Sequence, residues 1–167
     1  MKRIRALLVV LVLSPPILAG DFENGFAAAS FGDWKTAYDL WTPLAEKGDA
    51  RAQYHLAVLY DEGKGVPQNP EAALQWYRRA AKQCHSGAQR NLGLMLNEGQ
   101  IEQANRILSY KWLSIAANAG SEIARSERDT LAQLMLEKHA DRAQRLASSW
   151  LESHCRDKSA SMVRIPP

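Results

Sequence analysis

The sequence predicts an all-α protein, an α-solenoid of about four antiparallel helix pairs. The first observation behind this fold class is a block of sequence that recurs at a spacing of 36 residues. Alanines mark two positions of the block: Ala45, Ala81 and Ala117, and Ala52, Ala88 and Ala124. A fixed period of this length is typical of solenoids, in which each unit buries its apolar face against its neighbours. The second observation is that apolar residues follow helical spacing throughout, and no stretch alternates with the period of two expected of a strand.

Within one unit the pattern predicts a helix, a loop and a second helix that packs back on the first. Ala52, Leu56, Leu59 and Tyr60 lie on one face of the first helix. Glycine and proline concentrate in residues 61–70, which predicts a loop. Apolar spacing then predicts a second helix over 71–82, and both helical patterns recur over 88–96 and 109–116.

The two ends are expected to depart from the repeat, because the end units of a solenoid are atypical. We expect a first helix pair over 22–31 and 34–47 and a closing pair over 121–136 and 138–151. In the closing pair four apolar side chains are expected to face inward: Leu131, Leu134, Leu146 and Trp150. The repeat domain is then residues 20–152, with units at 22–51, 52–87, 88–123 and 124–152, and a polar, disordered tail is expected over 153–167.

The first 19 residues have the three parts of a secretory signal peptide. Lys2, Arg3 and Arg5 provide positive charge, residues 6–13 are apolar, and Ala19 offers a small residue for cleavage. The alternative, an uncleaved anchor, is disfavoured because eight apolar residues followed by two prolines are far short of the roughly 20 that cross a bilayer. We therefore expect an exported protein, periplasmic or fully secreted, with no integral membrane span after cleavage.

The charge balance argues against polyanionic partners. The signal segment holds three of the 21 Lys and Arg residues, so the mature chain has 18, equal to its 18 Asp and Glu residues. A net charge of zero provides no electrostatic attraction to nucleic acid or to an anionic membrane surface. We expect neither as a partner.

Small and aromatic residues of the repeat suggest how the units join. Gly48 and Gly120 are placed to end a helix in a left-handed conformation, and Cys84 stands at the equivalent position. Because a residue with a side chain adopts that conformation at a higher cost, we expect the turn at Cys84 to differ. Leu40, Trp76 and Trp112 share another position and are expected to be core residues between units. 

The two cysteines, Cys84 and Cys155, could form a disulfide in an oxidising compartment if the tail folds back on the stack. Two unpaired thiols are the alternative. The pairs Cys84-His85 and His154-Cys155 also suggest zinc, but neither has the spacing of common zinc sites, and no metal is expected.

No constellation of catalytic residues is evident in the sequence, so we expect no enzyme activity and no cofactor. There is no nucleophile elbow, no His-Glu-x-x-His motif and no glycine-rich phosphate loop. Acidic residues recur at Asp61-Glu62 and Asn97-Glu98, either as a paired carboxylate site or as part of a solvated loop. The repeat itself accounts for their recurrence, which favours the loop.

A binding face is the more promising hypothesis. Six residues on the first helices of the two middle units lie off the core face: Tyr54, His55, Val58, Arg90, Asn91 and Leu94. Tyr and Arg are favoured at protein interfaces, and two of the six are apolar where the pattern predicts exposure. These residues either line a surface that contacts a partner or pack against adjacent inner helices.

Residues 52–81 resemble a Sel-one-like repeat, a variant of the tetratricopeptide repeat with units near 36 residues. The resemblance rests on motifs that occur in the order typical of the family: Leu56-Ala57, Tyr60, Gly63-x-Gly65-Val66, Ala73 and Trp76-Tyr77. It extends over about residues 22–150, although the third unit has Ile101 in place of the second loop glycine. The resemblance implies a right-handed superhelix with a concave inner face.

The resemblance also implies a function of the protein-binding class. Such proteins are adaptors, and exported bacterial members act in the cell envelope. The expected function is therefore a non-enzymatic scaffold in the envelope that binds a protein through its concave face. The alternatives are a periplasmic immunity protein that neutralises a toxin or effector and, less favoured, a cell-wall enzyme or penicillin-binding protein. A branch of the family linked to penicillin has a cysteine pair in each repeat, whereas this chain has two cysteines in total.

Overall fold

A computed structural model describes residues 20–99 and 105–155 of the chain. The signal segment 1–19 and residues 156–167 of the expected tail lie outside this part. Within it the backbone forms eight α-helices and no strand. They are α1 (Asp21–Ser30), α2 (Trp34–Glu46), α3 (Ala50–Glu62), α4 (Pro70–Lys82), α5 (Ser86–Glu98), α6 (Arg106–Asn118), α7 (Glu122–Ala132) and α8 (Glu137–His154).

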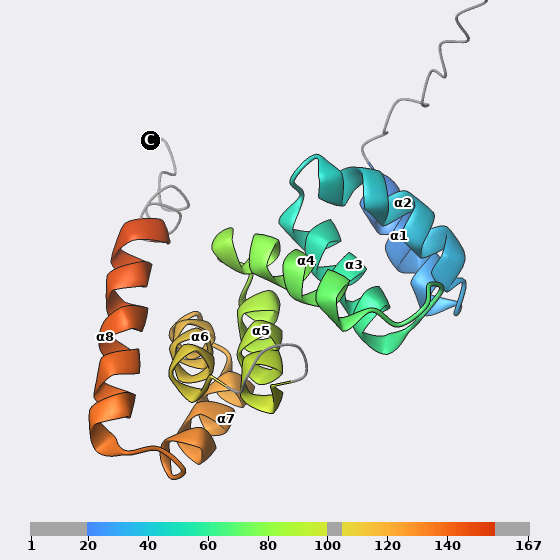
Figure 1. Cartoon of the computed structure of the whole chain (residues 1–167). Helices are drawn as coiled ribbons and strands as arrows, with labels where there is room; N and C mark the ends of the chain where they lie inside the picture. The colour runs from blue at the N-terminus through green and yellow to red at the C-terminus, as the bar shows by residue number, and fades with distance from the viewer. Residues whose placement is uncertain (1–19, 100–104, 156–167) are drawn as a thin grey trace, which may run out of the picture.

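The helices follow one another as packed pairs, which confirms the predicted all-α solenoid. In Figure 1 the chain progresses from α1 and α2 at the right, through α3 to α6, to α8 at the left. α1 packs on α2, α3 on α4 and α5 on α6, and the second helix of each of these pairs also packs on the first helix of the next. Each pair is thus covered by its neighbour, as a solenoid requires.

Polar side chains that recur every 36 residues determine where the helices begin. The second helices α2, α4 and α6 start after Asp33, Asn69 and Asn105, whose side chains accept hydrogen bonds from backbone amides of the first turn. The first helices α3, α5 and α7 start in the same way after Asp49, His85 and Ser121. Such caps satisfy amides that would otherwise have no partner in the helix. 

The turn at Cys84 corrects one prediction, because it has the same conformation as its two glycine counterparts. Gly48, Cys84 and Gly120 all have positive φ, of 100°, 67° and 95°. In each turn the amide of this residue donates to the carbonyl three residues earlier, and the next amide donates to the carbonyl five residues earlier. Cys84 is the one non-glycine residue with positive φ in the described chain, and it forms a disulfide with Cys155.

The predicted residues Trp76 and Trp112 do pack against the core, and Trp76 contacts two adjoining clusters, but the residue after each is buried more completely. The fully buried series is Trp41, Tyr77 and Leu113, and the residues before them, Leu40, Trp76 and Trp112, are only half-buried. Consecutive side chains of a helix point about 100° apart, so only one of two neighbours can face the first helix of its pair. Gly25 and Gly93 make room for Trp41 and Leu113, since a Cβ on them would lie 2.5 and 2.9 Å from those side chains.

The last helix departs from the repeat. α8 packs along α6, where Ala143 and Ala147 are fully buried and Trp150 meets Trp112 with ring centroids 5.1 Å apart. Cys155, directly after α8, forms a disulfide with Cys84, with Cα atoms 6.1 Å apart. Residues 153–155 therefore belong to the folded unit and not to a disordered tail, because helix α8 and the bridge hold them.

No helix in the described residues combines the length and the apolar character needed to cross a membrane.

Candidate functional site

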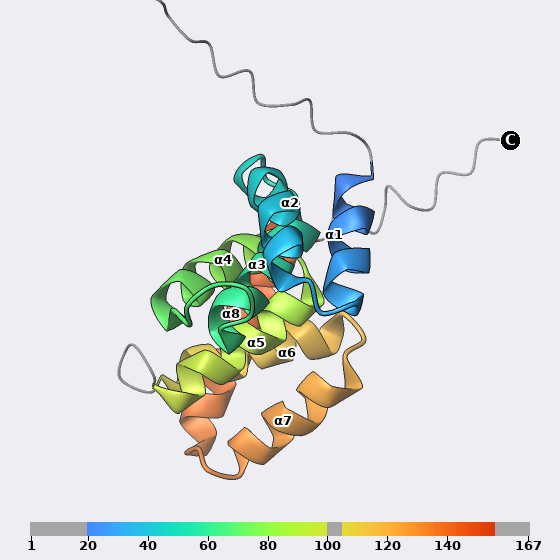
Figure 2. The same ribbon diagram turned by 90° about the vertical axis from the view of Figure 1, so that its right-hand side faces the viewer.

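The candidate site is the surface formed by the first helices α1, α3, α5 and α7, which we call the inner face. Figure 2 shows α1 at the upper right and α7 at the bottom, with α3 and α5 between them. All six residues proposed from the sequence lie on α3 and α5 and are half-buried: Tyr54, His55, Val58, Arg90, Asn91 and Leu94. Their surroundings decide whether they face a partner or pack on their neighbours.

Aromatic rings cover the half of the inner face near the N-terminus. His55 is stacked on Trp41 at 4.7 Å between ring centroids, and Phe22 and Phe26 lie 5.5 and 6.0 Å from it. On its other side His55 meets Tyr54 at 5.1 Å. Because Phe26 is still 54% exposed, this cluster remains open to a partner.

Tyr54 connects two histidines that are 30 residues apart in the chain. Its ring contacts His55 and is stacked on His85 at 4.6 Å. The His85 Nδ1 accepts a hydrogen bond of 3.2 Å from the Ala88 amide, so this nitrogen carries no proton. Burial lowers the pKa of His85. Burial also lowers the pKa of His55 to about 4, followed by the charge that His85 carries when it is protonated and by that of Arg51. Both imidazoles are neutral at pH 7 and act as aromatic surface.

Hydrogen bonds occupy the middle of the inner face. The Tyr77 hydroxyl donates to Asp61 Oδ2 at 3.2 Å and accepts from Asn91 Nδ2 at 2.9 Å. Burial raises the pKa of Tyr77 and that of Asp61. Asn91 is thus engaged with its neighbours, and we call Asp61, Tyr77 and Asn91 the polar bridge.

Arg90 is engaged as well, in a forked ion pair with α7. Its Nε donates to Glu127 Oε2 at 2.8 Å, and its Nη2 donates to Glu127 Oε1. The two side chains remain 30% and 24% exposed. Such a pair fixes α5 against α7 while leaving charged atoms at the surface.

The first of two hollows on this face lies between α1 and α3 and is almost entirely apolar. It has a volume of about 240 Å³. We call this hollow the N-terminal pocket. It is lined by Phe26, Ala29, Ser30, Trp34, Trp41, His55, Val58 and Leu59. Two residues of the sequence hypothesis, His55 and Val58, contribute to it.

The second hollow lies between α5 and α7 and has a polar rim. Its volume is about 250 Å³. We call this hollow the C-terminal pocket. It is lined by Leu94, Asn97, Leu113, Ser126, Glu127, Thr130, Leu131 and Leu134. Leu94 is the residue of the sequence hypothesis that lines it.

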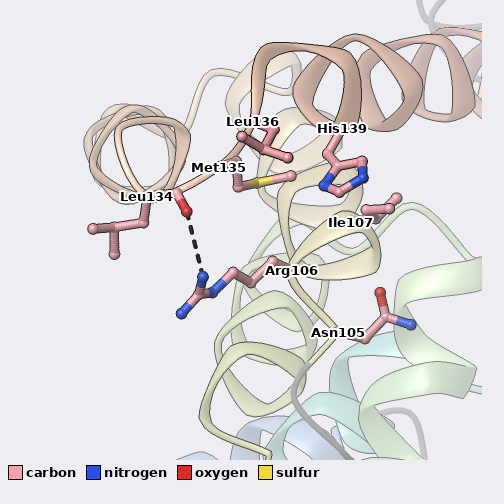
Figure 3. Close-up of a pocket in the computed structure, with 7 residues that line it drawn as sticks. All are labelled: Asn105, Arg106, Ile107, Leu134, Met135, Leu136 and His139. Atoms are coloured by element: carbon pink, nitrogen blue, oxygen red, sulfur yellow. Dashed lines mark hydrogen bonds between the residues drawn. The ribbon is translucent and has the colours of Figure 1, made fainter.

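A larger hollow of about 580 Å³ lies away from the inner face, between the start of α6 and the turn that joins α7 to α8. Figure 3 shows Arg106 reaching toward the Leu134 carbonyl, to which it donates at 3.3 Å. Among the described residues that line this hollow, His139 is the one imidazole and none is a carboxylate.

The described residues also contain no cluster of three or more His, Cys, Asp or Glu side chains that could hold a metal ion. Of the acidic residues that recur in the sequence, Asp61 accepts a hydrogen bond from Tyr77, and Glu62 forms an ion pair with Lys64. The inner face offers an aromatic cluster and two hollows as surface for binding.

The sequence hypothesis missed four residues of this surface: Phe22, Phe26, Trp41 and Glu127. The two phenylalanines lie in α1, whose repeat is 32 residues from the next and not 36: Gly25 faces Trp41 as Gly93 faces Leu113. A search with a variable period could have found them. Glu127 occupies the third copy of the position of His55 and Asn91, which a comparison at 36-residue spacing would have found.

Comparison with known proteins settles the family. The Sel1 repeat matches residues 50–83 and 86–121, which correspond to α3–α4 and α5–α6. The chain is a Sel1-like repeat protein. Sel1 repeats generally mediate protein–protein interactions, and their fold is typically a non-catalytic scaffold.

Two solved structures share the fold of this Sel1-like repeat protein. The structure of c5321, a protective antigen present in uropathogenic Escherichia coli strains, superimposes with a TM-score of 0.77 at 23% identity, over 88% of this chain and 32% of that one. A Sel1 repeat protein from Oxalobacter formigenes superimposes with a TM-score of 0.65 at 28% identity, over 80% of this chain and 55% of that one.

Curated relatives match less than half of this chain. An F-box protein of Arabidopsis thaliana is 33% identical over 72 residues, which are 43% of this chain and 20% of that protein. Chitin synthase regulatory factor 2 of Schizosaccharomyces pombe is 35% identical over 65 residues, which are 39% of this chain and 13% of that protein. The chain thus spans at most a fifth of these two relatives.

Proposed function

We propose that this Sel1-like repeat protein is a non-enzymatic scaffold that binds another protein through its inner face. The observation that carries the proposal is the open aromatic cluster on α1 and α3, built from Phe22, Phe26, Tyr54 and His55. Aromatic residues are enriched at the energetic centres of protein interfaces, because they bury large apolar areas at a small entropic cost. 

The proposed location is the bacterial cell envelope, in the periplasm. The basic and apolar residues at the start of the chain support export. The bond between Cys84 and Cys155 is consistent with this, because disulfides persist in oxidising compartments. Fractionation of cells that produce the chain, followed by thiol labelling under denaturing conditions, tests both points. Recovery in the cytoplasm with two labelled cysteines would contradict the proposed location.

A crosslinked pull-down from the native envelope tests the binding function. The bait is compared with an inner-face variant that combines Tyr54→Ala, Val58→Arg and Leu94→Arg. The matched control carries Gln75→Arg, Gln144→Arg and Ser148→Arg, three changes at exposed positions of the outer helices α4 and α8. We expect one dominant protein that the inner-face variant loses and the control retains.

Equal recovery of that protein by the wild type and the inner-face variant would refute the proposal. Thermal unfolding of both variants checks that any loss is not caused by misfolding. If the recovered protein is a toxin, the scaffold acts as its immunity protein, and the affinity should then lie in the picomolar range.

A further inference from the structure

The two pockets of the inner face lie at equivalent positions of the solenoid, two repeats apart. Trp41 forms part of the N-terminal pocket and Leu113 of the C-terminal pocket, and these residues occupy equivalent places in α2 and α6. Leu59 and Leu131 are likewise equivalent, as are Val58 and Thr130. Both hollows therefore form where two first helices diverge above the core residue of a second helix.

The polar bridge occupies the corresponding place between the two pockets. Tyr77 is the counterpart of Trp41 and Leu113, and its hydroxyl joins Asp61 of α3 to Asn91 of α5. The inner face thus presents an apolar hollow, a group of hydrogen-bonding side chains and a second hollow, in this order from α1 to α7. A single linear segment of a partner protein can contact these three parts of the surface one after another.

The size of the pockets indicates which side chains they accept. A cavity of about 150 Å³ lined by apolar residues is large enough to hold benzene. The N-terminal and C-terminal pockets, at about 240 and 250 Å³, therefore accommodate a phenyl or isobutyl group each. None of the described residues that line the N-terminal pocket carries a formal charge at pH 7, so this pocket favours an aromatic ring. Glu127 and Asn97 at the rim of the C-terminal pocket favour an apolar stem with a polar end.

The repeat determines how far apart these side chains must be. Neighbouring helix axes lie about 10 Å apart, so two repeats separate the pockets by about 20 Å. An extended chain covers about 3.3 Å per residue and spans this distance in about six residues. An extended segment also has free backbone N–H groups for the Asp61 carboxylate, which can accept hydrogen bonds besides the one from Tyr77, whereas a helix has satisfied its own.

We propose that the inner face binds an extended segment of its partner protein with two anchor side chains about six residues apart. An aromatic ring enters the N-terminal pocket, and a side chain with an apolar stem enters the C-terminal pocket. This inference rests on the proposed scaffold function and specifies the chemistry of the partner.

Selection from a random dodecapeptide phage library on the disulfide-bonded protein tests the inference. We expect a consensus with an aromatic residue and a second large apolar residue separated by five to seven positions. The synthetic consensus peptide should lose at least tenfold in affinity on Val58→Arg, which fills the N-terminal pocket. It should lose as much on Thr130→Arg, which fills the C-terminal pocket. Phe31→Ser, at a side chain that is 91% exposed and outside both pockets, is the control and should leave Kd unchanged.

Replacing each anchor of the peptide by alanine assigns it to a pocket. In the Val58→Arg variant, replacing the aromatic anchor by alanine should cause no further loss of affinity. In the Thr130→Arg variant, replacing the second anchor should cause no further loss. Far-UV circular dichroism verifies the fold, and Ser30→Arg, at the exposed rim of the N-terminal pocket, replaces Val58→Arg if that variant unfolds.

The outcomes separate this inference from the scaffold function. Peptides with a single anchor, peptides whose affinity is independent of anchor spacing, or a library without enriched sequences would overturn the two-pocket inference. The scaffold function would still stand if the pull-down partner were lost by the inner-face variant. Peptides that bind all three pocket variants at full affinity, together with a partner retained by the inner-face variant, would overturn both.

Discussion

The disulfide between Cys84 and Cys155 should provide a large share of the stability of this small solenoid. The bridge connects residues 71 apart in sequence and ties the end of α8 to the turn between α4 and α5. Closing a loop of that length lowers the entropy of the unfolded chain and stabilises the fold by about 4 kcal/mol. We therefore expect Cys155→Ser to lower the free energy of unfolding by about that amount.

The left-handed backbone of Cys84 leads to a second prediction, about which residue is best tolerated at this position. Its φ of 67° places it in the left-handed region, where Gly48 and Gly120 stand in the other repeats. A residue with a Cβ pays about 1 kcal/mol more than glycine to adopt this conformation. In the Cys155→Ser background, Cys84→Gly should therefore be more stable than Cys84→Ser by about 1 kcal/mol, although both lack the bridge.

Urea denaturation followed by far-UV circular dichroism measures these differences. Comparable m values across the variants would show that the same amount of surface is exposed on unfolding. An unchanged midpoint for Cys155→Ser would refute the role of the bridge. A glycine variant no more stable than the serine variant would refute the argument from the left-handed turn. Hydrogen exchange should show faster opening of α8 when the bridge is absent, because this helix otherwise packs mainly on α6.

Three further measurements test individual contacts. Burial lowers the pKa of His55 to about 4, so between about pH 6.5 and pH 4 the unfolded chain binds a proton that the folded chain does not. The free energy of unfolding should therefore decrease as the pH falls from about 6.5 toward 4. In urea titrations, His55→Phe should make this decrease smaller between about pH 7 and 5. A double-mutant cycle on Arg90 and Glu127 should give a coupling energy of about 1 kcal/mol, since the pair is forked but partly exposed, and a value near zero would contradict its role in joining α5 to α7. Gly25→Ala should lower the thermal midpoint by several degrees, equivalent to about 1–3 kcal/mol, because its Cβ would lie 2.5 Å from Trp41 Nε1; an unchanged midpoint would show that α1 shifts freely.

The repeat and its helices could be predicted from the sequence because they depend on local signals. Helix caps, turn glycines and apolar spacing act within one or two turns of the chain, and the 36-residue period makes each signal visible more than once. The pattern does not reveal that Tyr77 is buried more completely than Trp76. Both are large and adjacent, and which of them faces α3 depends on the packing of two helices, which residue type does not reveal.

The end of the solenoid was harder to predict, because it has no second copy. Leu131 is buried as expected, but Leu134 and Leu146 are 63% and 39% exposed. Their predicted inward placement requires a closing pair in which α8 packs on α7. In the structure α8 packs along α6 instead, and the small residues Ala143 and Ala147 face that helix. The disulfide next to this contact joins residues 71 apart in sequence, which no local pattern encodes.

The candidate face was predicted in part, and the comparison of equivalent positions explains why its chemistry is specific to this chain. At the alanine positions of the repeat the residue type is constant, because the helix crossing leaves room for a methyl group only. Along the inner face the residue type changes from one repeat to the next. One position reads Phe22, Tyr54, Arg90 and Ser126, and another reads Phe26, Val58, Leu94 and Thr130.

This change runs in one direction, from aromatic side chains at α1 to polar ones at α7. Packing does not require it, since every repeat keeps the same core position in its second helix. An inner face with a direction cannot bind a segment equally well in both orientations: the aromatic end of the partner must lie at α1. Reversing the selected peptide while keeping both anchors should therefore weaken binding at least tenfold. Equal affinity for the reversed peptide would show that the two pockets act only as generic apolar surface.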